Sequence, residues 1–246
     1  MGTRIERRDD GIVVLTVDHP PVNALPVRGW YELAEALGGT APEDRVVVLR
    51  AEGRGFNAGV DIKELAADTG HQKLVAVNDG CYRAFKAVYE CPVPVISAVQ
   101  GFCVGGGIGL VGNSDVIVAA EDATFGLPEV DRGALGAATH LSRLVPQHMM
   151  RAMFYTGTTA TAAQLHGFGS VHQVVPNDGL REAAMNLAAD IAAKDPLVIR
   201  KAKAALNGID PVDVNRSYRY EQGFTFELNL TGVSDSARAE FIRGEA

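Results

Sequence analysis

The apolar residues of the first 195 positions follow two spacings, which predict strands separated by helices. Short runs rich in Val and Ile and bounded by turn residues are typical of strands; these runs are Ile12–Asp18, Arg45–Glu52, Val93–Val99, Val116–Ala120 and Ser170–Val175. Apolar residues that recur every three or four positions predict helices, at Val27–Leu37, His71–Tyr89, Gly136–Val145, Gln147–Tyr155 and Asp178–Lys194. This alternation is typical of an α/β fold.

The pattern changes after Asp195-Pro196, where no further strand is expected. Helical spacing continues to the end of the chain, over Leu197–Leu206, Val212–Leu230 and Ser234–Arg243. We therefore divide the chain into an α/β core at residues 1–195 and a C-terminal helical region at residues 196–246. Tyr220, Phe224 and Glu227 share one face of the second of these helices, and we expect that face to pack on the core or on a neighbouring subunit.

Composition narrows the class of protein. The chain has 246 residues, 47% of them apolar, which is enough for a large buried core. Its formal net charge of −7 argues against nucleic acid or an anionic membrane as a partner. No apolar leader and no run of about 18 apolar residues occurs, and the three cysteines lack paired or zinc-type spacing. We expect a cytoplasmic protein with reduced, mostly buried thiols.

Two glycine-rich turns stand in matching contexts, since each follows a predicted strand and opens a helix. They are Phe56–Asp61 after the second strand and Val104–Gly109 after the third. Two such turns can each supply one free backbone N–H, and two N–H groups that converge on one point stabilise a developing oxyanion. Glu129, which follows Pro128, is a candidate acid or base. The alternative is that both are only tight turns, and for Asp61 we favour a helix N-cap over a chemical role.

Several other sites are disfavoured by the sequence. It contains no GxxxxGK[ST], GxSxG or HExxH string, and its six histidines lack metal-type spacing. Gly107–Gly112 does read GxGxxG, with Glu129 twenty residues after Gly109. In a dinucleotide site, however, this string opens the first strand-to-helix turn, whereas here two strands precede it. His140 is kept as a candidate because it lies shortly after Glu129.

Four motifs resemble those of the crotonase superfamily, the enoyl-CoA hydratase/isomerase family, and they occur in family order along essentially the whole chain. They are Pro21–Leu25, Phe56–Glu64, Gly101–Gly109 and Phe125–Glu129. The resemblance implies a crotonase-like spiral of ββα units, with the C-terminal helical region covering the active site and building a homotrimer or a hexamer that is a dimer of trimers. It also implies an acyl-CoA substrate, with coenzyme A as part of the substrate, no separate cofactor and no metal.

The same resemblance assigns roles to residues. The thioester oxygen is expected on the N–H groups of Ala58 and Gly106, and Glu129 is the expected catalytic carboxylate. The residues expected to bind coenzyme A or substrate are Asn23, Ala24, Leu25, Ala58, Gly59, Val60, Asp61, Ile62, Gly105, Gly106 and Gly109.

One position departs from the family pattern. Hydratases of this family use two glutamates, and the position of the first is occupied here by Gly109. Addition of water to a double bond normally needs a paired acid and base, so ordinary hydratase chemistry is disfavoured unless Asp131 or His140 substitutes. The missing side chain is also expected to leave room for a fused ring.

Longer strings resemble a branch of the family that acts in bacterial steroid breakdown; they are Gly53–Glu64, Tyr89–Ala119, Phe125–Arg151 and Tyr218–Leu230. That branch opens ring D of a bicyclic β-diketone CoA thioester by a retro-Claisen C–C hydrolysis. The resemblance therefore implies a hydrolase with one general base and an oxyanion hole. Two alternatives remain: an enoyl-CoA hydratase or isomerase that uses Glu129 alone, and a non-catalytic acyl-CoA binder.

Overall fold

The computed structural model describes residues 2–67 and 71–244 and contains two sheets. The larger sheet has the strand order β1-β2-β3-β4-β6-β9, in which β1 and β2 are antiparallel and the other pairs are parallel. Its strands are β1 (Gly2–Arg7), β2 (Ile12–Asp18), β3 (Val46–Ala51), β4 (Val95–Val99), β6 (Val116–Ala120) and β9 (Gln173–Val175). The smaller sheet joins β5 (Phe102–Val104), β7 (Thr124–Gly126) and β8 (Thr159–Thr161).

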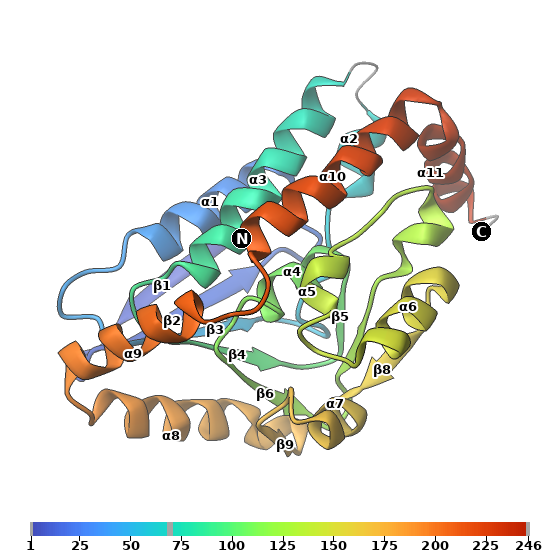
Figure 1. The fold of residues 1–246 in the computed structure, drawn as a ribbon. Helices are drawn as coiled ribbons and strands as arrows, with labels where there is room; N and C mark the ends of the chain where they lie inside the picture. Colours follow the sequence, from blue (N-terminus) through green and yellow to red (C-terminus); the bar gives the residue numbers. More distant parts are fainter. Residues whose placement is uncertain (1, 68–70, 245–246) are drawn as a thin grey trace.

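Side chains of the large sheet alternate between two apolar layers. Leu15 and Leu49 face a core that includes α1 (Val27–Gly38) and α3 (Gln72–Tyr89), which pack against each other. Val14 and Val48 face α8 (Leu180–Ala192) on the opposite side (Figure 1). Because strand side chains point alternately to the two faces, both faces of these strands are buried.

Shorter helices and the C-terminal region surround this core (Figure 1). The helix α10 lies along α3 and α5, and α11 packs against η1 and α2. The remaining elements are α2 (Ile62–Ala66), α4 (Gly106–Val111), η1 (Pro128–Arg132), α5 (Ala138–Leu141), α6 (Gln147–Thr156), α7 (Ala162–Phe168), η2 (Asn177–Gly179), α9 (Pro196–Gly208), α10 (Val214–Leu230) and α11 (Val233–Arg243).

The predicted mixture of an α/β core and a helical C-terminus is confirmed, but some elements differ. The sequence pattern did not reveal β1, whose residues are mostly polar, or the three-residue strands β5, β7 and β8, which are too short to show a period. The helix predicted at Gly136–Val145 is only the single turn of α5. The three cysteines are free and buried, as expected. Within residues 2–67 and 71–244, no helix is long and apolar enough to cross a membrane.

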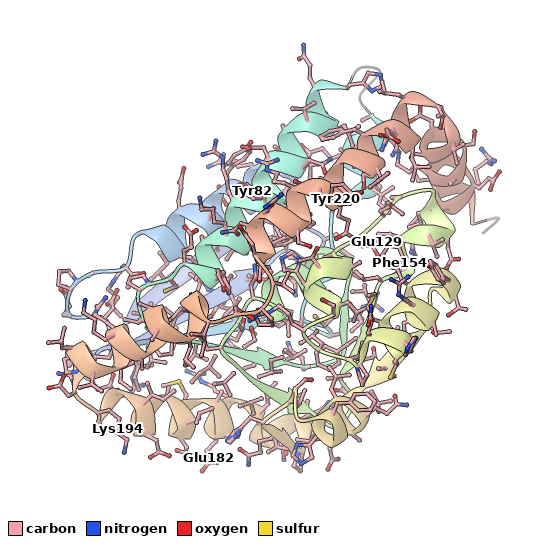
Figure 2. The ribbon with its side chains drawn as sticks, in the orientation of Figure 1. Tyr82, Glu129, Phe154, Glu182, Lys194 and Tyr220 are labelled. Atoms are coloured by element: carbon pink, nitrogen blue, oxygen red, sulfur yellow. The ribbon has the colours of Figure 1, made fainter. Side chains whose placement is uncertain are left out.

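The aromatic face predicted on the late helix does not pack on the core of this chain. Tyr220 is 73% exposed and Phe224 is 42% exposed, with Tyr220 on the outer side of α10 (Figure 2). The aromatic residue that α10 does bury is Tyr218. Packing on a neighbouring subunit stays a prediction.

Candidate functional site

The two glycine-rich turns lie against each other. A methyl group added to Gly59 would lie 3.1 Å from the nitrogen of Gly106 and 3.5 Å from Cα of Gly105. Gly59 and Gly105 also have φ angles of +84° and +60°, which side-chain-bearing residues rarely adopt. The N–H of Val104 donates to the carbonyl of Asn57 at 2.9 Å and joins the turns. Glycine is therefore needed for both the backbone conformation and the close approach.

Two backbone donors remain free where the turns meet. The N–H groups of Ala58 and Gly106 donate to no described residue, whereas Gly59 donates to Asn57 and Gly105 donates to the carbonyl of Gly126. The nitrogen of Gly106 begins α4, so it has no partner within its own helix. The structure thus brings together the two residues that were predicted to form an oxyanion hole.

Asparagine side chains hold the first turn in place. Asn57 donates to the carbonyl of Asn23 at 2.7 Å, and its Oδ1 accepts from the N–H of Gly59 at 2.8 Å. Asn23 donates in turn to the carbonyls of Glu52 and Gly55, at 2.7 and 2.9 Å. Asn57 was not among the predicted site residues. Its sequence signal is its place two residues before a glycine, which is typical of a side-chain-stabilised turn.

The segments expected to hold coenzyme A also lie side by side. Leu25 donates to the carbonyl of Gly59 at 2.8 Å, and Asp61 donates to the carbonyl of Leu25 at 3.0 Å, so residues 23–25 run beside residues 59–62. Asp61 caps α2, because its carboxylate accepts from the N–H groups of Lys63 and Glu64. The interpretation of Asp61 as an N-cap is confirmed.

Aromatic rings fill the space behind the second turn. A methyl group on Gly106 would lie 2.6 Å from Cη2 of Trp30, and one on Gly109 would collide with the ring of Phe85. The prediction that Gly109 leaves room for a fused ring is wrong, because Phe85 occupies that space. Phe85 packs edge-on to Trp30, with ring centroids 5.6 Å apart. Gly109 is therefore buried under Phe85, and its expected role in binding substrate stays a prediction.

Glu129 lies beside the two free N–H groups. Its Oε1 would be 2.6 Å from a methyl group on Gly105, the residue before Gly106. Its carboxylate is carried by η1, which packs against α6 and α11 (Figure 2). Oε2 is buried and has no hydrogen-bond partner among the described residues. Glu129 as a whole is half-buried, so its carboxylate is partly shielded from solvent and still free to interact with a ligand.

The environment of Glu129 favours proton exchange near neutrality. Burial raises the pKa of Glu129 to about 7, the nearby guanidinium of Arg132 opposes the rise, and Glu221 adds to it. A carboxyl group with a pKa near 7 can act as either a base or an acid at physiological pH. These surroundings are typical of a catalytic carboxylate.

The two reserve candidates do not share this environment. His140 is 1% exposed and packs against Phe85 and Tyr218, with ring centroids 5.1 and 4.9 Å away. Burial and Arg143 lower the pKa of His140 to about 3, so its ring is neutral. Asp131 is exposed, and its carboxylate lies against Gly157 at the end of α6. The geometry favours Glu129 over both.

Glu221 is a second half-buried carboxylate that the sequence did not single out. It accepts hydrogen bonds from the N–H groups of Ala138 at 2.8 Å and Thr139 at 3.1 Å. Burial raises the pKa of Glu221 to about 7, although these N–H groups lower it in part. No sequence signal connects it with Glu129, because the two residues lie 92 positions apart on different elements.

Metal chemistry gives no competing site in the described part of the chain. No group of three or more His, Cys, Asp or Glu side chains there could hold a metal ion. Two surface hollows, of about 340 and 660 Å³, lie against α8 and between α1 and α3, and Glu129 lines neither. The candidate site therefore depends on the contacts described above.

Comparisons with known proteins agree with this arrangement. A family model described as "Enoyl-CoA hydratase/isomerase" matches residues 7–224. The chain is 66% identical over 244 residues to the "(7aS)-7a-methyl-1,5-dioxo-2,3,5,6,7,7a-hexahydro-1H-indene-carboxyl-CoA hydrolase" of Rhodococcus jostii (strain RHA1), covering 98% of this chain and 95% of the relative. It is also 66% identical over 237 residues to the protein of that name from Mycobacterium tuberculosis (strain ATCC 25618 / H37Rv), covering 96% of each chain.

Solved structures share the fold. The crystal structure of an enoyl-CoA hydratase/isomerase from Xanthobacter autotrophicus Py2 has a TM-score of 0.88 to this chain at 25% identity. The match covers 99% of this chain and 92% of that one.

Proposed function

This chain belongs to the enoyl-CoA hydratase/isomerase family, and from that premise we propose that it hydrolyses a ring C–C bond of a bicyclic diketone CoA thioester derived from a steroid. The crotonase-like fold expected from its motifs is confirmed by the likeness to the solved relative. Similarity to two proteins named as hydrolases of a dioxo-hexahydroindene-carboxyl-CoA supports the substrate class. The observation that carries the proposal is the carboxylate of Glu129, whose Oε2 is buried and unpartnered, beside two free N–H groups.

In the proposed reaction Glu129 takes a proton from water, and the resulting hydroxide adds to the ring ketone. The tetrahedral adduct then collapses to a carboxylic acid, which ionises in solvent, and the electrons of the broken C–C bond are delocalised towards the thioester as an enolate. The N–H groups of Ala58 and Gly106 stabilise the enolate oxygen, and protonated Glu129 returns the proton to carbon. One water is consumed, and one base serves both proton transfers because its pKa is about 7.

Phe85 explains why this chemistry is favoured over hydration. It fills the space beside Gly109, so a second carboxylate at that position would not fit. The proposed hydrolysis uses a single base, so it does not need a second carboxylate at this position. The proximity of Glu129 to the free N–H groups likewise favours an enzyme over a non-catalytic acyl-CoA binder.

We propose the remaining binding roles on the same premise. Residues 23–25 and 58–62 would hold the coenzyme A portion, and Gly105 and Gly106 would border the thioester. Coenzyme A is then part of the substrate, and no separate cofactor takes part. The free, buried cysteines support a cytoplasmic location, where thiols stay reduced.

The C-terminal region is proposed to build a trimer or hexamer. Of the 16 large apolar side chains exposed among the described residues, 11 lie after residue 196, including Leu197, Ile209, Tyr220, Phe224 and Leu230. An exposed apolar surface of this kind is typical of an interface. Light scattering on the purified protein would test the assembly, and a monomer at micromolar concentration would contradict it.

Turnover of two substrates tests the activity. The protein is incubated with crotonyl-CoA and with a bicyclic diketone CoA thioester, and the products are analysed by mass spectrometry and infrared spectroscopy. Both reactions add one water, so the deciding readout is loss of the ring-ketone signal. We expect the protein to open the diketone ring and to hydrate crotonyl-CoA very little. The rate of ring opening should fall about 10³-fold or more in Glu129→Gln. Hydration alone would support the hydratase, and turnover of neither would support the binder.

A further inference from the structure

The segment that follows η1, residues 133–139, forms one side of the surroundings of Glu129. A methyl group on Gly136 would lie 2.8 Å from Cδ and 2.9 Å from Oε2 of Glu129. The N–H of Ala134 also donates to the backbone carbonyl of Glu129 at 3.0 Å. The position of this segment therefore determines how the catalytic carboxylate is packed.

The C-terminal helices hold this segment at four points, one of which is the contact at 2.9 Å between the hydroxyl groups of Ser217 on α10 and Thr139. Ser234 of α11 donates its hydroxyl to the carbonyl of Gly133, and Thr225 of α10 donates to the carbonyl of Leu135 at 3.3 Å. One turn earlier on α10, Glu221 accepts from the first two N–H groups of α5. Two of these contacts, at residues 133 and 135, precede Gly136, and the other two, at residues 138–139, follow it. The C-terminal region therefore holds the segment on both sides of the place where Gly136 lies against Glu129.

Glu221 differs from the three hydroxyl contacts, made by Ser217, Thr225 and Ser234, because it carries a charge. Its two oxygens take one N–H each, at 2.8 and 3.1 Å, and no cation forms an ion pair with it among the described residues. Helix N-termini favour negative charge, and charge-assisted hydrogen bonds are about twice as strong as neutral ones. Loss of the Glu221 carboxylate would leave two buried N–H groups of α5 without a partner.

We propose that Glu221 is a positioning residue for the catalytic base, because it holds residues 136–139 in contact with Glu129 from the C-terminal helical region. The proposal deepens the proposed hydrolase function and rests on it for the activity readout. Under this proposal the C-terminal region contributes to the reaction whether or not the protein forms a trimer or hexamer. It also predicts an electrostatic effect, since ionised Glu221 raises the pKa of Glu129.

The other groups near the two carboxylates keep one charge state near neutrality. Burial raises the pKa of the Cys81 thiol and of the Tyr218 phenol, and burial lowers the pKa of His140, so all three are neutral. Arg132 stays positive and favours ionised Glu129. Only Glu129 and Glu221 titrate near pH 7 in this cluster, and coupled groups lose their protons in two shared steps.

The test compares Glu221→Gln with Glu227→Gln. Both remove one negative charge from α10, but Glu227 is exposed, so its variant is the matched control. We measure kcat/KM for the diketone CoA thioester between pH 5 and 9. In Glu221→Gln the acid limb should become a single step and move to lower pH, and kcat should fall about tenfold as Glu129 loses its fixed position. Glu227→Gln should follow the wild type at every pH.

A role limited to capping α5 predicts a different result. In that case Glu221→Gln would lower stability or kcat but leave the acid limb at the wild-type pH, which would overturn the proposal. An unchanged pH profile with unchanged kcat would also overturn it.

A readout without turnover separates this proposal from the proposed function. The carboxyl carbon of Glu129 is titrated by NMR in protein labelled with ¹³C-glutamate, and Glu129→Gln identifies its signal. We expect the midpoint of Glu129 to fall in Glu221→Gln and to stay in place in Glu227→Gln. If the wild type fails to open the diketone ring, the proposed function is wrong, while this titration still decides whether Glu221 acts on Glu129.

Discussion

The two turns that form the candidate oxyanion hole are held in place by different forces. The turn at residues 55–59 depends on hydrogen bonds with side-chain amides, since Asn57 accepts from the N–H of Gly59 at 2.8 Å and Asn23 donates to the carbonyl of Gly55 at 2.9 Å. The turn at residues 105–109 depends on close packing, because Trp30, Phe85 and Glu129 lie directly against its glycines. The first turn should therefore fail when a polar group is lost, and the second should fail when an atom is added.

The largest effect is expected from adding one methyl group to the second turn. Gly105→Ala would place Cβ 2.6 Å from Oε1 of Glu129 at a residue with φ of +60°. The carboxylate must move, and we expect kcat to fall about 10³-fold, as when an oxyanion donor or base is lost. Steady-state kinetics on the diketone CoA thioester measures the fall.

Gly53→Ala is the matched control for that substitution. Gly53 has a similar φ of +82°, but nothing lies within 4 Å of an added methyl group. It should show the cost of backbone strain alone, about 1–2 kcal/mol of unfolding free energy, with kcat near the wild-type value. Equal losses of kcat in the two variants would mean that strain, and not the contact with Glu129, explains the first result.

Removal of a polar group should break the first turn. Asn57→Ala leaves the N–H of Gly59 and the carbonyl of Asn23 without their partner, so the N–H of Ala58 loses its fixed direction. We expect kcat to fall about 10²-fold with a smaller change in KM, because the donor acts mainly on the transition state. An increase in KM alone would show that this turn binds coenzyme A without stabilising the oxyanion.

A smaller effect is expected deeper in α4, where Gly109 meets Phe85. Gly109→Ala should lower the unfolding free energy by about 1–3 kcal/mol, because the methyl group collides with the ring. Phe85→Ala alone opens a cavity and should cost about 3–5 kcal/mol. In the double variant the methyl group enters that cavity, so the two losses should not add. Additive losses, measured by urea unfolding, would show that the two residues are not coupled.

The second turn should also respond to pH, since it touches a titratable group. Burial raises the pKa of Glu129 from 4.5 to about 7, so the stabilising contribution of the protonated form is present below pH 4.5 and is lost as the pH rises through 7. Glu129→Gln should therefore gain stability relative to the wild type above about pH 7 and match it near pH 4. Thermal unfolding of both proteins at the two pH values measures the difference. If the variant and the wild type are equally stable at both, Glu129 is more exposed to solvent than the structure indicates.

Features that depend on neighbouring residues could be predicted from the sequence. The Val- and Ile-rich runs predicted the central strands of the large sheet, the glycine positions after two of these strands predicted both turns, and Asp61 predicted its own cap. These features follow from periodicity and local hydrogen bonding, which act over a few residues. The family motifs added the pairing of Ala58 with Gly106 and the choice of Glu129.

Only the tertiary structure decided which side chains surround these residues. Phe85 covers Gly109 from a different helix, so a position that suggested open space is filled. His140 is neutral because aromatic rings from α3 and α10 bury it, and Glu221 reaches the segment beside Glu129 from the C-terminal region. Such contacts join residues that are tens of positions apart, and they depend on how whole elements pack, which local sequence patterns do not encode. The sequence by itself determined the turns and predicted Glu129 as the base, and packing determined the space and the charge around them.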